Sequence, residues 1–114
     1  MSAITTHVLD TSLGRPAAGV EVTLEQQRQD DSWVTLGAGR TDADGRLGTL
    51  LRGGQRAAPG VYRITFDVGA YFSARATAAF FPSVQIAFSV TAPEEHHHVP
   101  LLLSPFGYST YRGS

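Results

Sequence analysis

The 114-residue chain contains no cysteine. Disulfide bonds, thiolate metal sites and a cysteine nucleophile are therefore excluded, so any catalysis must depend on other groups. Basic and acidic residues nearly balance, nine against ten, and leave a net charge of −1. This balance favours neither nucleic acid nor an acidic membrane surface as a partner. No apolar run approaches the roughly 20 residues that a membrane-spanning helix needs.

Several catalytic and targeting motifs are also missing. The sequence has no G-x-S-x-G elbow, no H-E-x-x-H pair and no phosphate-binding glycine loop, so acyl-serine, zinc-protease and nucleotide chemistry have no local support. The opening stretch MSAITTHVLD lacks the basic and apolar regions of a secretory signal, and the last three residues are not Ser-Lys-Leu. We expect a cytoplasmic protein that folds as one domain over residues 1–114.

What the sequence does contain is a repeated alternation of apolar and polar residues. These short runs have a period of two and are separated by turn-forming residues at about 8–12-residue intervals, a pattern typical of an antiparallel β-sandwich. Strands are predicted at 4–10, 20–25, from Trp33 onward, at 47–51, 62–68 and 84–90, and on both sides of the turn SPFG.

The segments between these runs are predicted to be turns, loops and one helix. Residues 10–19 (DTSLGRPAAG) and 52–60 (RGGQRAAPG) are typical of loops, and Asp44-Gly45 forms the corner of a tight turn in TDADGR. Residues 70–79 fit neither period well, but their alanine and arginine content and their lack of Gly and Pro favour a short helix. The total is about eight strands and one helix.

Three consecutive histidines, His96, His97 and His98, are the first candidate for chemistry. In a strand, His96 and His98 share a face while His97 points the other way, so the pair could offer two imidazoles to one metal ion or one substrate. The alternative is a polar strand edge on which His96 and His97 are simply solvated. The spacing alone leaves both interpretations open.

The face that carries His98 continues through Pro100 and Leu102. Because proline has no N–H to donate, this strand is expected to lie at a sheet edge or to have its pairing interrupted at Pro100. If the strand pairs with the segment after SPFG, His98 and Tyr111 lie near each other on a sheet surface.

His7 and Arg46 are the other two candidates. His7 lies in the middle of an apolar strand, where it is either a satisfied core or interface histidine or a functional imidazole, and Arg46 follows a turn, where a solvated arginine is the default. Together with His98, they would supply what hydrolysis of an activated amide needs: imidazoles that exchange protons near pH 7 and a cation that balances developing negative charge.

Four segments, in order along the chain, carry a resemblance to a known family: HVLDTSLGRPAAGV, TDADGR, FFP and HHHVPLLLSPFGYSTYRGS. They resemble the 5-hydroxyisourate hydrolases, the transthyretin-related enzymes of urate breakdown. The terminal Tyr-Arg-Gly-Ser is the most specific part, because it separates these hydrolases from the hormone-carrying transthyretins. The resemblance implies an all-β, transthyretin-like sandwich of two sheets and eight antiparallel strands with one short helix. It also implies a homotetramer, a dimer of dimers, with its sites in a central channel.

The resemblance also implies the site residues. It makes His7, Arg46, His98 and Ser114 catalytic, and it assigns substrate binding to His7, Arg46, Tyr111, Arg112 and Gly113. The expected substrate is 5-hydroxyisourate, whose ring opens at the N1–C6 amide to give 2-oxo-4-hydroxy-4-carboxy-5-ureidoimidazoline. The two histidines would share the proton transfers, Arg46 would stabilise the oxyanion, and Tyr111 and Ser114 would shape the pocket.

One position departs from the family pattern, since His97 stands where the family usually has tyrosine. Because this side chain is expected to point away from the face of His98, we expect activity to survive. No metal or organic cofactor is implied, because a strained cyclic amide is already electrophilic and acid–base help contributes about 10²–10⁴ in rate. The alternative function is a transthyretin-like tetramer that carries a small aromatic ligand without converting it.

Overall fold

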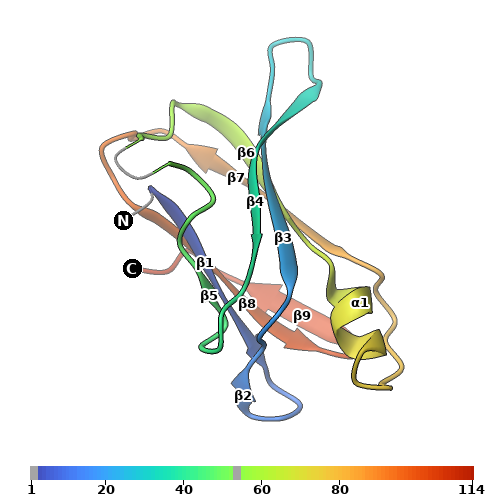
Figure 1. Ribbon diagram of the computed structural model, residues 1–114. Coiled ribbons are helices and arrows are strands. Elements are labelled where there is room, and N and C mark those ends of the chain that lie inside the picture. The colour runs from blue at the N-terminus through green and yellow to red at the C-terminus, as the bar shows by residue number, and fades with distance from the viewer. Residues whose placement is uncertain (1–2, 53–54) are drawn as a thin grey trace.

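The computed structural model describes residues 3–52 and 55–114, which form two sheets packed face to face (Figure 1). The elements are β1 Ile4–Asp10, β2 Arg15–Pro16, β3 Glu21–Gln27, β4 Trp33–Arg40, β5 Arg46–Leu47, β6 Gly60–Phe66, α1 Val68–Ser73, β7 Val84–Val90, β8 His97–Ser104 and β9 Gly107–Thr110. One sheet has the order β2-β1-β8-β9, with β5 also paired to β1, and the other has the order β4-β3-β6-β7. The predicted sandwich with one short helix is confirmed.

Two details of the predicted topology are wrong. The described residues contain nine strands rather than eight, because Arg15–Pro16, inside the predicted loop 10–19, pairs with the end of β1. The strands are also not all antiparallel, since β1 and β8 run in the same direction over their whole length. Parallel pairing requires a long connection, and here nearly the whole chain lies between the two strands.

The alternation of side chains along the strands builds the core. In β1, residues Ile4, Thr6, Val8 and Asp10 are buried, while the residues between them are partly exposed, as the period-two pattern predicts. The inner faces of both sheets, the helix α1 (Phe72) and the segment after β5 (Leu50) contribute the largest fully buried side chains. Those from the strands include Tyr62, Phe66, Ile4, Leu24, Ile64, Leu101 and Leu103. These residues fix which face of each strand remains outside.

The strand predicted at 47–51 is wrong beyond Leu47, where β5 ends. Leu50 and Leu51 are both buried, and consecutive residues of a regular strand cannot both point into one core. The chain instead passes close to β4, where a Cβ at Gly37 would clash with the carbonyl oxygen of Leu50. Gly53 and Gly54 of the predicted loop 52–60 lie outside the described residues.

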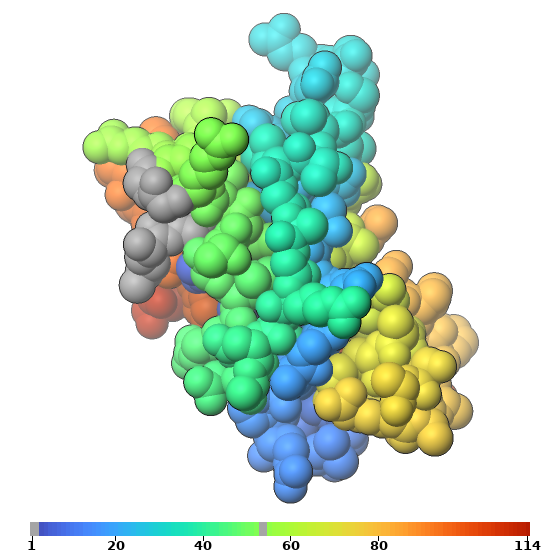
Figure 2. Space-filling model, in the orientation of Figure 1, coloured from blue at the N-terminus to red at the C-terminus, as the bar shows by residue number. Residues whose placement is uncertain are grey.

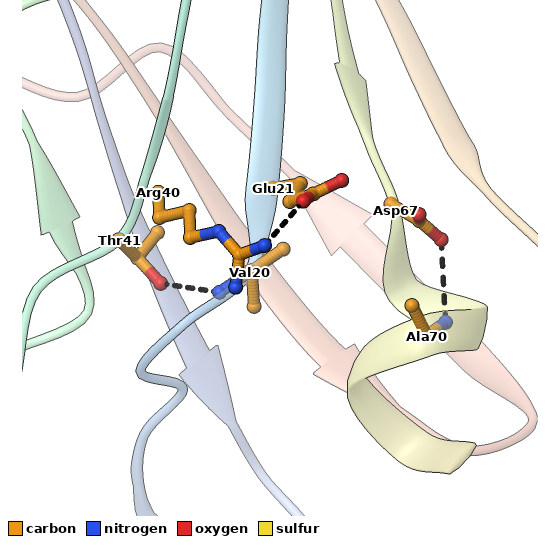
Figure 3. A network of polar contacts seen from close by, with 6 residues as sticks. All are labelled: Val20, Glu21, Arg40, Thr41, Asp67 and Ala70. Carbon is orange, nitrogen blue, oxygen red and sulfur yellow. Dashed lines mark hydrogen bonds and ion pairs between the residues drawn. The ribbon is translucent and has the colours of Figure 1, made fainter. Parts of the chain in front are cut away.

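The helix begins and ends earlier than the predicted 70–79. Asp67 caps it, because its side chain accepts a hydrogen bond from the N–H of Ala70 at 3.2 Å (Figure 3), and Val68 therefore starts the helix rather than ending a strand. After Ser73 the chain turns through Ala76, whose φ of 53° is incompatible with a continuing helix. The Tyr71 hydroxyl donates to Asp10 at 2.8 Å and so ties the helix to the end of β1.

The molecule has a compact body and one projecting element. Figure 2 shows the hairpin of β3 and β4, in cyan, extending beyond the rest of the surface. The described residues contain no helix with the length and apolar character needed to cross a membrane. The start of β1 and the C-terminal end of the chain lie on the same side of the molecule (Figure 1), and this is where the candidate residues gather.

Candidate active site

The outer face of β1 and β8 carries the predicted histidines. In the parallel register, Thr5 lies opposite His98 and His7 lies opposite Pro100. On the other side of β1, Arg46 of β5 is paired directly with His7. Because paired residues share a face of the sheet, the side chains of His7, Arg46 and His98 all emerge on the side away from the core.

His98 is held through its Nδ1 atom. This nitrogen lies 2.7 Å from the Thr5 hydroxyl oxygen, and the same oxygen lies 2.9 Å from Nε2 of His96. The two imidazole rings are stacked, with centroids 6.2 Å apart and planes inclined by 24°. The prediction that His96 and His98 share a face is therefore confirmed, and Nε2 of His98 is the nitrogen left for other partners.

His7 is held through its other nitrogen. Its Nε2 lies 2.9 Å from the backbone carbonyl oxygen of Asp44, in the turn before β5. A carbonyl oxygen only accepts hydrogen bonds, so Nε2 of His7 must carry the proton. In the neutral ring, Nδ1 then holds the lone pair.

Pro100 shapes the end of the chain around His98. The β9 ladder covers Leu101–Ser104 of β8 and stops before Pro100, as expected for a residue without an N–H. The chain leaves the sheet and returns at Gly113, whose N–H donates to the carbonyl of His98 at 2.8 Å. The predicted interruption at Pro100 is thus confirmed, and the strand after the SPFG turn ends at Thr110.

Gly113 touches the ring of His98. A Cβ at this glycine would approach Cδ2 of His98 to 2.5 Å and Cγ of Pro100 to 3.2 Å, distances shorter than van der Waals contact. Only a residue without a side chain allows the backbone to pass this close. Gly113 therefore fixes the position of the imidazole from the outside.

A hollow of about 270 Å³ lies beside these residues. Three of the residues predicted as catalytic line it together: His98, Arg46 and Ser114. The other lining residues are Thr5, Thr6, Leu47, Gly48 and His96. His7 adjoins the hollow through its pairing with Arg46 but is not among the lining residues.

Tyr111 and Arg112 are placed elsewhere. They line a second cavity, of about 240 Å³, between β7 and the chain end, together with His97 and His98. Arg112 forms an exposed ion pair with Glu95 at 2.9 Å, and Tyr111 is 58% exposed. Of the residues predicted to bind substrate, these two therefore line a different cavity from Arg46, and His98 is the residue that lines both cavities.

The surroundings of His98 favour its neutral form. Burial is the main cause that lowers its pKa below the ordinary value of 6.5, because a partly buried cation loses hydration. The nearby side chains of His96, Arg46 and His7 lower the pKa further by electrostatic repulsion. Near pH 7, His98 therefore offers a lone pair rather than a positive charge.

His97 and His96 have opposite environments. His97 is only 5% exposed, and its Nδ1 has no hydrogen-bond partner among the described residues, so the interpretation of His97 as a solvated residue is wrong. His96 is exposed, as that interpretation expected. Residues 3–52 and 55–114 contain no group of three or more His, Asp or Glu side chains placed to hold a metal ion.

Two contacts of the site were not predicted from the sequence. Thr5 was placed on the face of His7, but its contact with His98 depends on the parallel register of β1 and β8, for which the sequence has no local signal. The contact of His7 with Asp44 uses a backbone carbonyl, which residue types do not reveal.

The sequence matches the HIUase/transthyretin family over residues 4–113. It is 49% identical to a 5-hydroxyisourate hydrolase of Salmonella dublin over 111 residues, which cover 97% of this chain and 80% of that protein. Among solved structures, the Klebsiella pneumoniae 5-hydroxyisourate hydrolase is 38% identical with a TM-score of 0.84, covering 100% of this chain and 94% of that one. Sea bream transthyretin in complex with thyroxine is 33% identical with a TM-score of 0.90, covering 97% and 94%.

Proposed function

The chain belongs to the HIUase/transthyretin family, and from this premise we propose how its residues carry out the hydrolysis of 5-hydroxyisourate. That hydrolysis is its activity and is a step of urate degradation. The observation that carries the proposed mechanism is the hollow in which a neutral imidazole, His98, and a cation, Arg46, face one space.

His98 acts as the general base. Its Nε2 removes a proton from the attacking water, which adds to the C6 carbonyl of the substrate ring. Its lowered pKa suits this role, because an effective base must be unprotonated at the working pH. The same nitrogen then returns the proton to the leaving N1 atom, and the amide bond breaks.

Arg46 stabilises charge on the substrate oxygen, and His7 orients the substrate. Arg46 emerges beside the hollow and stabilises the oxyanion that forms at C6. His7 is anchored through Nε2–H to the carbonyl of Asp44 and can present Nδ1 to a substrate N–H. Ser114 closes the hollow, and Gly113 holds the ring of His98. Tyr111 and Arg112 line the second cavity, which His98 also lines, and take no part in this hollow.

The fold alone would suit a hormone carrier equally well, since the transthyretin from sea bream has the same architecture. A carrier does not need two oriented imidazoles beside an arginine, because an aromatic ligand binds better to an apolar slot. The arrangement of His98, His7 and Arg46 therefore favours catalysis.

We further propose that the enzyme works as a homotetramer, a dimer of dimers. Within the described residues, β7 and β9 form sheet edges without a neighbouring strand, and Phe80 and Phe106 are each 71% exposed. Unpaired edges and exposed aromatic side chains are features that a second copy can cover. Light scattering after size exclusion would test this assembly. The cytoplasmic location stays a prediction.

The function is tested with freshly generated 5-hydroxyisourate, whose ultraviolet absorbance decays as the ring opens. The purified protein is expected to accelerate this decay, both with and without EDTA. Replacing Arg46 by methionine removes the oxyanion contact and is expected to lower kcat by about 10²–10³-fold. His98→Asn removes the base and is expected to lower kcat by about 10²–10⁴-fold.

Arg40→Met is the matched control. Arg40 lies in the other sheet, where it forms an exposed ion pair with Glu21 at 2.6 Å (Figure 3), so its replacement is expected to leave kcat unchanged. Decay no faster than the spontaneous reaction with the native protein would contradict the proposed function. Equal loss in the Arg40 and Arg46 variants would contradict the role of Arg46.

A further inference from the structure

The Thr5 hydroxyl connects two imidazoles of very different exposure. Its oxygen is 2.7 Å from Nδ1 of His98, which is partly buried, and 2.9 Å from Nε2 of His96, which is exposed to solvent. Both rings line the hollow. The register of β1 and β8 fixes this arrangement, because Thr5 and His98 are directly paired. The three side chains therefore form a continuous hydrogen-bonded path from the partly buried ring of His98 to the exposed ring of His96.

The hydroxyl has one proton, so it can donate to only one of the two rings and must accept from the other. If Thr5 donates to His96, it accepts from Nδ1–H of His98, and Nε2 of His98 keeps its lone pair. If Thr5 donates to His98, then His98 carries its proton on Nε2 and cannot act as a base. The tautomers of the two histidines are thus coupled through one oxygen.

We propose that Thr5 and His96 are positioning residues for His98, and that His96 holds the positive charge while the ring-opening reaction proceeds. This inference rests on the function proposed above and deepens it. In the resting state, Nδ1–H of His98 donates to Thr5, and Thr5 donates to Nε2 of His96. The free Nε2 of His98 then faces the hollow.

The proton transfers balance at each step. When Nε2 of His98 takes a proton from water, its Nδ1 proton passes to the Thr5 oxygen, and the Thr5 proton passes to Nε2 of His96. His98 is then neutral with its proton on Nε2, and His96 is the cation. When His98 gives that proton to the leaving nitrogen, both transfers reverse and restore the resting state.

The charges around the hollow favour this displacement. His98 faces Arg46 from β5, His7 from β1 and His96 from its own chain segment, and all three disfavour a cation at His98. His96 is exposed, and water hydrates a cation there. Burial and these neighbours lower the pKa of His98. This agrees with a positive charge that is transferred from His98 to His96.

The first test compares Thr5→Val with Thr5→Ser. Valine has the shape of threonine without its hydroxyl, so kcat is expected to fall by about tenfold or more with little change in KM, within the range of acid–base contributions. Serine keeps the hydroxyl and is expected to retain kcat within about threefold. Thr23→Val, on the outer face of the other sheet, is the control for a threonine outside the site and is expected to behave as the native protein.

The second test reads the tautomers directly by nitrogen NMR of the imidazoles. In the native protein, His98 is expected to carry its proton on Nδ1 near pH 7, and in Thr5→Val this preference is expected to be lost. A native His98 protonated on Nε2 would overturn the proposal. An unchanged tautomer in Thr5→Val would also overturn it, because the loss of activity would then be structural.

The third test replaces His96 by alanine. The variant is expected to lose about tenfold or more in kcat, to shift the acid limb of its pH profile to higher pH, since a repelling neighbour of His98 is gone, and to recover activity with added imidazole. A pH profile identical to that of the native protein would overturn the role of His96. If the native protein shows no activity on 5-hydroxyisourate, the proposed function fails, while the NMR measurement still decides whether the two tautomers are coupled.

Discussion

The inner and outer faces of the paired strands β1 and β8 consist of alternate residues of the same two segments, but they contact entirely different surroundings. On the inner face, Ile4, Val8 and Leu101 have no exposed surface and pack against the other sheet. On the outer face, Thr5 and His98 are partly exposed and hydrogen-bonded to each other. The same ladder of backbone hydrogen bonds between β1 and β8 holds the inner and the outer side chains in place.

This difference shows how the core of a small sandwich determines where the reactive side chains of its outer face lie. Because the core fixes the register of β1 and β8, it also fixes which outer side chains meet, and a slip by one residue would exchange the two faces. His97 differs from the apolar side chains of the inner face, because it is an imidazole whose Nδ1 has no hydrogen-bond partner among the described residues. Four predictions test how independent the two faces are.

The largest effect is expected on the inner face. Leu101→Ala removes a fully buried side chain and is expected to lower the free energy of unfolding by about 2–5 kcal/mol. Leu102→Ala changes the neighbouring residue, which is only half-buried on the outer face, and is expected to cost less than half as much. Urea denaturation of both variants measures the difference, and equal losses would refute the assignment of the faces.

The next effect is expected where the chain end meets the outer face. Gly113→Ala places a methyl group against the ring of His98 and is expected to lower kcat by about 10–100-fold by displacing the imidazole. Gly107→Ala is the control, because its added Cβ meets nothing closer than 3.7 Å. Steady-state kinetics compare the two variants, and a fully active Gly113 variant would show that contact with His98 is not required.

A smaller effect of the opposite sign is expected at His97. Replacing it by phenylalanine removes the unpaired buried nitrogen and fills space next to the cavity of about 240 Å³. The free energy of unfolding is expected to rise by about 1 kcal/mol, since leaving such a group unsatisfied costs about 1–3 kcal/mol. Activity should stay within about twofold, because the side chain points away from the hollow. A destabilised variant would reveal a polar role for this histidine.

The smallest effect is a pH dependence of stability from the outer face. Because the folded state lowers the pKa of His98 below 6.5, the unfolded chain binds this proton more readily. The contribution of His98 to stability is complete above pH 6.5 and is lost as the pH falls through the lowered pKa. Urea denaturation across this range should show a shallower loss of stability toward acid in His98→Asn than in the native protein, and identical slopes would contradict this.

Much of the fold could be predicted from the sequence, because alternation is a local property. The runs at 4–10 and 84–90 match β1 and β7 residue by residue. The errors lie where tertiary contacts override local preference: Asp67 starts the helix early, and Leu50 and Leu51 both turn into the core. The parallel direction of β1 and β8 could not be predicted either, because strand pairing is decided by the whole topology.

The roles of the predicted site residues stay predictions, but the structure does show how those residues are arranged. Alternation placed His98 on a sheet surface but left His7 open between the core and a functional role, and the structure brings His98, Arg46 and Ser114 to one hollow. Tyr111 lines the second cavity together with His98, so the two lie near each other as predicted. Tyr111 nevertheless lies outside β9, because the ladder between β8 and β9 stops before Pro100. The hydrogen bonds of His7 and His98 depend on a carbonyl and a hydroxyl from other segments, which no spacing along the chain encodes.

The pairing of β1 with β8 also has a consequence for biosynthesis. Thr5 and His98 are 93 residues apart, so a ribosome must complete most of the chain before the two can meet. Closing so long a loop costs conformational entropy before any contact is formed, and folds rich in such distant contacts form slowly. Recovery of activity after dilution from denaturant would therefore report the moment at which β1 and β8 have joined.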